Sequence, residues 1–263
     1  MMDKTIYINA DDYGRSEIIS KNILKTIDLG MINSVSIMVN HNKKIYETLK
    51  GRKVKKKLHI NLTDFSPNHK FEKNELILKK LTFFKLMFLK KKQREVVFNE
   101  IERQINLYVD YFKVSEIIVD GHQHIHVIPW IYNYLIRYEN IKIVEIRLPK
   151  EKFFIGDIKT FFKLKFYRNL IAYLLLNIII TFFLKEKIYS PPYSGMIYSG
   201  IYNEKIFVNN YKLMKRKYPS FEIAFHPGFT TEDEQNEFYD LFFKYYSSKE
   251  RKEEFSLALK KLI

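Results

Sequence analysis

The sequence predicts a single α/β domain with a barrel-like fold of mostly parallel strands. Short segments rich in Ile, Val and Phe alternate with longer stretches whose apolar residues recur every three or four positions. Strands that alternate with helices form parallel sheets or barrels. The chain has 263 residues, 46% of them hydrophobic, and contains no Pro/Gly/Ser-rich linker. We therefore expect one domain over residues 1–263.

Six segments are typical of strands. The first is Thr5–Asn9, which ends at the acidic turn Asp11-Asp12-Tyr13-Gly14. The others, in chain order, are Ser34–Val39, Leu58–Leu62, Glu116–Val119, Ile141–Ile146 and Phe221–Phe225. In parallel folds the chemistry lies at the C-terminal ends of the strands, so the residues that follow each segment are the candidates for a site.

Several stretches have helical periodicity. The first follows Ser16, a typical N-cap residue, and has Ile19, Ile23 and Ile27 on one face and Gly30 at its end. The others are Glu95–Phe112, Trp130–Tyr138, Asn203–Lys217 and Glu232–Tyr246.

Three segments are less regular. The charge run Lys53–Lys57 is typical of a solvated surface, and Glu75–Lys92 mixes apolar and basic residues as a lid or membrane-surface helix would. Asn169–Leu184 is strongly apolar, but sixteen residues are too short to predict a transmembrane span. A buried helix is the favoured interpretation of this segment, with membrane-surface contact or a homodimer contact as alternatives. Because a barrel covers only one side of a helix, we expect its other side to be exposed, with cations at the rims: Lys163, Lys165, Arg168, Lys185 and Lys187.

The charge balance is strongly basic. The net charge is +15, with 36 Lys but only 9 Arg. Such a charge favours acidic partners, yet the chain has neither a helix-turn-helix pattern nor an aromatic RNA-binding box, so nucleic acid is not a predicted partner. There is no cysteine, which excludes disulfides and thiolate metal sites. The first residues contain no apolar run typical of a signal peptide, so we expect a cytoplasmic protein, with the inner face of the membrane as a further location.

Histidines and aspartates gather at the predicted strand ends. His122, His124 and His126 follow the strand Glu116–Val119, His226 follows Phe221–Phe225, and His59 lies within the third strand. Taken singly, the Asp-Asp pair is typical of a turn, a strand histidine of a core residue, and His-Pro-Gly of a turn. Their coincidence around one edge of the sheet predicts a metal site instead.

Imidazole and carboxylate suit divalent first-row metals, and a catalytic site typically has three protein ligands. The metal activates water, a second carboxylate accepts the water's proton, and a histidine can protonate a leaving amine. Adjacent aspartates at a turn point in different directions, so one can bind metal while the other acts as the base.

Five motifs, in this order, resemble the YdjC-like carbohydrate deacetylases, which include chitooligosaccharide deacetylases. They are Ile8–Gly14, Val35–Asn40, His59–Thr63, Asp120–His126 and His226–Gly228. The resemblance runs from about residue 5 to the C-terminus and is loose at 64–95 and 150–200, where we expect variable insertions. Gly121 departs from the pattern, because the family more often has serine there.

The resemblance implies a β/α barrel with one divalent metal, Mg²⁺ or Zn²⁺, at its C-terminal mouth. Asp12, His59 and His122 would ligate the metal. Asp11 would be the general base and His226 the acid. The residues expected to contact the substrate are Arg147, His124 and His126.

The predicted function is metal-dependent removal of the acetyl group from an N-acetylated sugar, with release of acetate. The sugar is an oligosaccharide, a polysaccharide intermediate or a glycolipid. One alternative is a metal-dependent hydrolase of another amide or ester. Another is a basic protein that binds a membrane surface or nucleic acid without catalysis.

Overall fold

Seven parallel strands form one curled sheet in the computed structural model, which describes residues 5–39 and 43–262. The strand order is β5-β4-β3-β2-β1-β7-β6. The strands are β1 (Ile6–Tyr13), β2 (Ser34–Ile37), β3 (Lys55–Ile60), β4 (Glu116–Gly121), β5 (Lys142–Ile146), β6 (Tyr193–Ser194) and β7 (Phe221–Phe225). This confirms the predicted parallel, barrel-like class. Asn40, the last residue of one predicted motif, lies outside the described residues.

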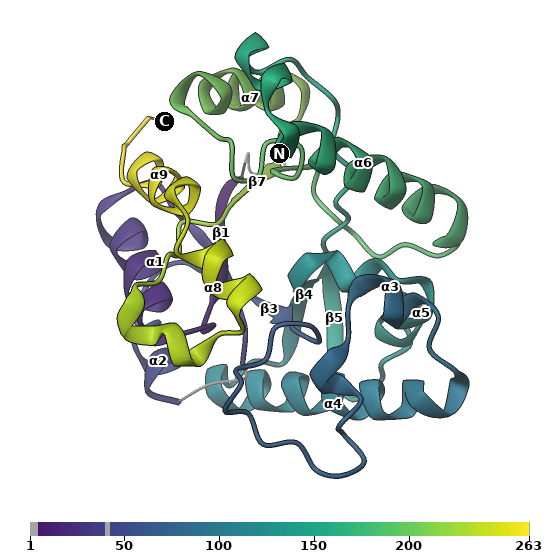
Figure 1. Ribbon diagram of the computed structural model, residues 1–263. Coiled ribbons are helices and arrows are strands. Elements are labelled where there is room, and N and C mark those ends of the chain that lie inside the picture. Colours follow the sequence, from purple (N-terminus) through teal and green to yellow (C-terminus); the bar gives the residue numbers. More distant parts are fainter. Residues whose placement is uncertain (1–4, 40–42, 263) are drawn as a thin grey trace.

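The sheet is curled and open between its edge strands, β5 and β6. Each paired strand is parallel to its neighbour, with His59 of β3 opposite Asp120 of β4. On the open side, the backbone N–H of Ile146 in β5 donates to the carbonyl oxygen of Tyr189, at 3.1 Å. Tyr189 belongs to the segment that leads into β6, so this irregular chain bridges the gap. The helices surround the strands on the outside (Figure 1).

The helices have bounds close to those predicted, with short additions. The α-helices are α1 (Glu17–Leu29), α2 (Lys43–Glu47), α3 (Phe83–Met87), α4 (Lys91–Phe112), α5 (Pro129–Ile136), α6 (Leu164–Ile178), α7 (Glu204–Lys217), α8 (Asp240–Tyr246) and α9 (Lys249–Ala258). The 3₁₀ segments are η1 (Leu78–Lys80), η2 (His122–Val127), η3 (Ile158–Phe162) and η5 (Glu232–Glu237), and η4 (Ile179–Phe183) is a π-helical turn.

Helix α1 begins and ends as its sequence predicts. The Ser16 hydroxyl accepts a hydrogen bond from the backbone N–H of Ile19, at 3.2 Å, which satisfies one free donor of the first turn. Gly30 follows the last residue, but with φ −110° it is not a left-handed cap. Glycine is needed there for space, because a Cβ would lie 2.1 Å from the carbonyl oxygen of Ala258 in α9.

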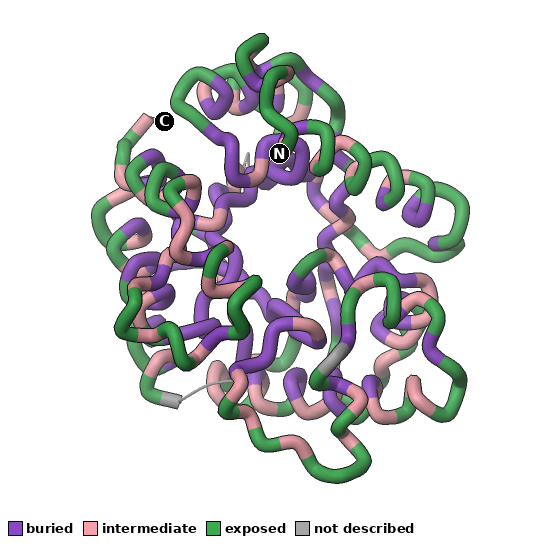
Figure 2. The backbone as a smooth tube through the Cα atoms, in the orientation of Figure 1, coloured by how far each residue is buried: buried purple, intermediate pink, exposed green. Residues whose placement is uncertain are grey.

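The core lies along the strands, and the outer helix faces are exposed (Figure 2). Every residue of β2 and β7 is buried. Strands covered on both sides are expected in a parallel sheet flanked by helices.

The charge run was wrongly interpreted as solvated surface. Lys55, Lys56 and Lys57 begin β3, and Lys57 is fully buried. The ammonium group of Lys57 forms an ion pair with the carboxylate of Glu222 in β7, which is also buried. A buried lysine requires such a partner, and this partner is 165 residues away in the sequence.

Two predicted helices are interrupted. Glu75–Lys92 contains η1, α3 and the start of α4 rather than one helix, because the backbone is extended at Leu81, Thr82 and Lys90. Glu232–Tyr246 is divided into η5 and α8. Between them the buried Phe238 ring lies under the Arg15 guanidinium, 4.1 Å away.

The apolar segment forms α6 and η4, which together run over Leu164–Phe183. Only 22% of their most apolar 18-residue stretch is buried. The prediction of a buried helix was therefore wrong, whereas the expected exposed side is present. The length argument also fails, because these 20 residues rise about 30 Å. By length and composition alone this helix could cross a membrane.

Candidate metal centre

The acidic pair lies at a distorted end of β1. The register between β1 and β2 shifts between Ala10 and Tyr13, and Asp12 has a left-handed φ of 71°. Such a conformation is costly for a residue with a side chain and often marks a functional site. The carboxylates of Asp11 and Asp12 contact different partners, Arg147 and His122 respectively.

Asp12, His59 and His122 converge, with one ligand atom from each lying within 4.8 Å of the other two. The Asp12 Oδ1 atom lies 3.0 Å from His122 Nδ1 and 3.4 Å from His59 Nε2. His59 comes from β3, and His122 begins η2 directly after β4. All three residues are buried. The C-terminal ends of β1, β3 and β4 therefore meet here.

The chemistry of these residues fits a divalent ion. Besides the atoms that converge, the second oxygen of Asp12, Oδ2, and the second ring nitrogen of His122, Nε2, are buried and have no hydrogen-bond partner among the described residues. Buried polar atoms without partners are rare and point to an ion or a ligand. One carboxylate and two imidazoles leave a position open for water or substrate in a tetrahedral site.

Asp120 orients His59. Its Oδ1 atom lies 2.6 Å from His59 Nδ1, while its Oδ2 atom accepts from the Ser36 hydroxyl at 2.6 Å. This leaves Nε2 of His59 facing Asp12. Although burial opposes it, the carboxylates of Asp120 and Asp12 raise the pKa of His59 to about 10. The space between Asp12 and His59 therefore favours a positively charged group.

Asp11 forms a second close group with His59 and Asp120, but its carboxylate has other partners than that of Asp12. Its two carboxylate oxygens accept a two-pronged pair of hydrogen bonds from Arg147, each 2.9 Å long, and Oδ1 also accepts from Asn9 Nδ2 at 2.7 Å. Burial acts to raise the pKa of Asp11, but Arg147 and His59 outweigh it and hold the pKa below its usual value. Asp11 is therefore an ionised carboxylate beside the candidate ligands.

His226 follows β7 and faces Asp11. Its Nε2 atom lies 3.8 Å from Asp11 Oδ2. Its backbone N–H donates to Glu254 at 2.8 Å, and Arg251 donates to its carbonyl oxygen at 3.2 Å. Burial, followed by the nearby Arg251 cation, lowers the pKa of the His226 ring. The ring is therefore neutral near pH 7.

A profile of YdjC-like proteins matches residues 5–261. The chain belongs to the YdjC-like family. It is 27% identical over 159 residues to a protein named chitooligosaccharide deacetylase from Enterobacter sp. (strain 638). That alignment covers 57% of this chain and 61% of the relative, so the chain spans less than two thirds of the relative's length.

The fold of this YdjC-like chain is also found in a crystal structure from Enterococcus faecalis V583. That protein is provisionally named a cellobiose-phosphate cleavage protein. The TM-score is 0.56 at 17% identity, with 99% of this chain and 97% of the other covered. At this identity the likeness concerns the fold alone.

The predicted substrate contacts divide into two groups in the YdjC-like site. His124, which has a left-handed φ of 58°, lines the pocket described below. His126 is fully buried, and its Nε2 lies 2.7 Å from the carbonyl oxygen of Arg147. Burial lowers the pKa of His126 to about 4. A Cβ on Gly121 would lie 2.9 Å from His126 Nδ1, so a serine there would require this ring to move.

Arg147 is also buried, and is only 1% exposed. Besides Asp11, its Nη2 atom contacts Asp120 at 2.8 Å and Glu222 at 2.5 Å. A guanidinium that pairs with three carboxylates holds them in place and has few donors left for a substrate. This placement favours a positioning role for Arg147 over the predicted substrate contact, and likewise for His126.

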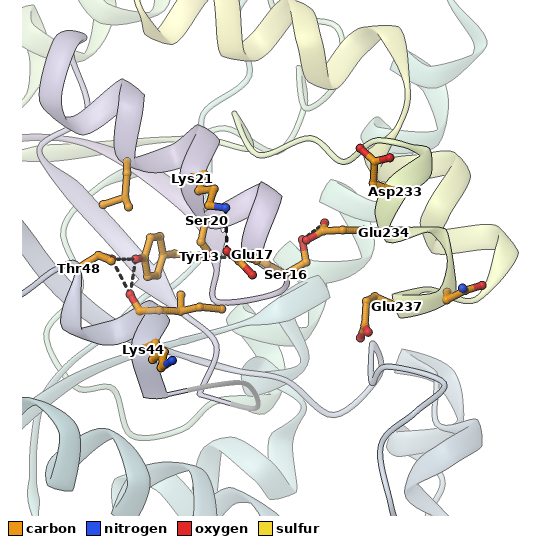
Figure 3. A pocket seen from close by; sticks show the side chains of 13 residues that line it. Tyr13, Ser16, Glu17, Ser20, Lys21, Lys44, Thr48, Asp233, Glu234 and Glu237 are labelled. Carbon is orange, nitrogen blue, oxygen red and sulfur yellow. Dashed lines mark hydrogen bonds and ion pairs between the residues drawn. The ribbon is translucent and has the colours of Figure 1, made fainter.

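The candidate centre opens into a cavity of about 820 Å³. Asp11, His59, His122 and His226 contribute to its base. Its walls include residues from α6 and α8. A separate cavity of about 640 Å³ lies between α1, α2 and η5 (Figure 3). Of the carboxylates in that second cavity, Glu234 already accepts from Ser16 and from the backbone N–H of Ile18.

Sequence reasoning missed two residues that shape the site. Asp120 belongs to one of the five motifs but was assigned no role, although its position at the end of a predicted strand could have indicated one. Glu151 is buried and accepts hydrogen bonds from Ser194 and from the backbone N–H groups of three successive residues, Gly195 to Ile197. It fixes the chain after β6, which lines the pocket. Nothing in the local sequence marks Glu151.

Proposed function

We propose that the protein is a metal-dependent hydrolase that removes the acetyl group from an N-acetylated sugar. The observation that carries the proposal is the meeting of Asp12, His59 and His122 beside Asp11 and His226. All of these residues except Asp12 line one cavity. Membership of the YdjC-like family and the name of the Enterobacter relative support acetylated sugar as the substrate.

Asp12, His59 and His122 would hold the ion, Mg²⁺ or Zn²⁺. A divalent ion there supplies a Lewis acid that activates water and polarises the acetyl carbonyl. Asp120 keeps His59 in the orientation and tautomer that leave Nε2 free for a metal. The left-handed φ of Asp12 directs its carboxylate to the same point.

Asp11 would act as the general base. It is ionised because Arg147 and His59 lower its pKa, and it is held rigidly by Arg147 and Asn9. Arg147 is thus a positioning residue. A base held beside the attacking water removes its proton as the oxygen bonds to the acetyl carbon.

His226 would deliver the proton to the departing nitrogen. Its Nε2 atom lies 3.8 Å from Asp11 Oδ2, and its lowered pKa keeps the ring neutral until Asp11 has collected the proton. The ring can then accept that proton and donate it as the C–N bond breaks. The products are acetate and the free amino sugar.

The test is release of acetate and of a primary amine from N-acetylated chitooligosaccharides, measured with protein loaded with Mg²⁺ or Zn²⁺. N-acetylglucosamine, acetamide and a simple acetyl ester are run in parallel. Equal amounts of acetate and amine from the sugars support the proposal. Hydrolysis of acetamide or the ester alone would assign another hydrolase activity, and no product from any substrate would reject catalysis of this kind.

A further inference from the structure

Helix α6 and the π-helical turn η4 that continues it carry an apolar stripe on their solvent side. Six large side chains, between 44% and 74% exposed, recur at spacings of three or four residues: Tyr167, Ile171, Leu174, Leu175, Ile178 and Phe182. Such spacing places them on one face of the helix. Figure 2 shows most of α6 as exposed. Contiguous apolar surface of this kind marks an interaction site.

The opposite face of α6 and η4 packs against the domain. Phe166, Leu176 and Ile180 are buried, and the side-chain amide of Asn169 donates to the carbonyl oxygens of Ile197 and Ser199 at 3.0 and 2.9 Å. The helix therefore lies along the surface of the domain (Figure 1). Spanning a bilayer would break these contacts, so its exposed face suits the surface of a membrane.

The charges within the helix and the segment before it all have one sign, and the nearest acidic residues in the sequence are Asp157 and Glu186 at the two ends. Residues 158–185 contain five cations and no Asp or Glu: Lys159, Lys163, Lys165, Arg168 and Lys185. An apolar helix face with basic residues beside it is the pattern of a helix that lies in the interface of an anionic bilayer. A second copy of the chain would bring like charges together at the same face, which disfavours a homodimer there.

Helix α6 also borders the candidate active site through residues beside the stripe. Leu164, Lys165, Arg168, Asn169 and Ala172 of α6 line the same cavity as His59 and His122. Across the mouth, α8 contributes Leu241, which is 76% exposed. A membrane seated on α6 would thus lie at the edge of the cavity.

We propose that the exposed face of α6 docks on an anionic lipid bilayer, and that the cavity receives the N-acetylated sugar head group of a membrane lipid. The substrate half of this inference rests on the proposed function, whereas the docking half does not.

Docking is tested by flotation of the full chain with vesicles of neutral phosphatidylcholine, or of phosphatidylcholine mixed with phosphatidylglycerol. We expect flotation with the anionic vesicles and loss of about tenfold or more in the bound fraction on Phe182→Glu. The double variant Leu174→Glu/Phe182→Glu should abolish it. Leu29→Glu, an equally charged change at a residue 64% exposed on α1, should leave it unchanged.

Circular dichroism confirms that each variant is folded, and light scattering gives its mass. Absence of flotation with folded wild-type protein would overturn the inference. So would flotation that the α6 variants do not reduce, or a dimer that these variants dissociate while vesicles are ignored.

The substrate half is tested with an N-acetylglucosaminyl lipid in anionic vesicles and with a soluble N-acetylated chitooligosaccharide. Leu174→Glu/Phe182→Glu should lower kcat/KM at least about tenfold on the vesicle substrate and leave soluble turnover unchanged. Equal activity of variant and wild type on the vesicle substrate, or turnover of the soluble substrate alone, overturns the lipid assignment. No acetate from either substrate rejects the proposed function, while flotation still decides the docking.

Discussion

Replacing Asp120 by Asn should weaken metal binding without removing any ligand. The charge-assisted contact between Asp120 Oδ1 and His59 Nδ1 is 2.6 Å long and fully buried. Loss of such a partner to a ligating histidine typically lowers metal affinity by about 10–100-fold, or about 1.4–2.7 kcal/mol. Asparagine keeps the shape of the side chain but also removes the carboxylate that pairs with Arg147 at 2.8 Å, so circular dichroism is used to verify that the variant is folded.

The pH dependence provides a second readout. In the wild type His59 has a pKa of about 10, raised by Asp120 and Asp12, so below that pH a metal must displace a proton. The apparent affinity should therefore rise about tenfold per pH unit between about pH 7 and 9. In Asp120→Asn the pKa of His59 falls, so the slope should be shallower and the limiting affinity at high pH lower.

Titration calorimetry with Mn²⁺ over this pH range measures both quantities and needs no substrate. Glu145→Gln is the matched control, because Glu145 is a buried carboxylate that pairs with Lys55 at the N-terminal end of β3, whereas His59 lies near the C-terminal end. If Asp120→Asn had the same limiting affinity and the same slope as the wild type and this control, the orienting role of Asp120 would be refuted.

Three further outcomes are expected. Asp11→Asn should retain metal, but its deacetylation rate should fall about 10²–10⁴-fold. His122→Ala should lose both metal binding and activity. If calorimetry showed equal loss of metal binding in the two variants, Asp11 would be a ligand. In the folded protein the pKa of His126 is about 4, below the ordinary 6.5. Its neutral ring therefore contributes stability above about pH 6.5, and up to about 3 kcal/mol of this free energy of unfolding is lost as the pH falls toward 4. Urea unfolding at pH 7 and 4.5 should show a smaller loss in His126→Gln, and an identical loss would contradict this. Gly30→Ala should cost about 1–3 kcal/mol, because its Cβ would meet Ala258 at 2.1 Å; an unchanged thermal midpoint would show that α9 moves freely.

Local patterns in the sequence were enough for most of the fold. The hydrophobic periodicity and Ser16 predicted α1, and the strand Phe221–Phe225 was predicted to the residue. These elements depend on propensity and capping, which act between near neighbours. The candidate site was also foreseeable, because parallel strands bring residues at their C-terminal ends to one edge whatever their separation in the chain.

The tertiary structure decided the partners of buried charges and the environment of α6. Lys57 is buried because Glu222 is beside it, and Arg147 holds Asp11 rather than facing the cavity. No local pattern encodes such pairs, because their energy depends on burial and on contacts made only in the folded chain. Likewise, the sequence showed that Asn169–Leu184 is apolar, but only the packing of the domain decided which face of the helix the core covers and which it leaves to solvent.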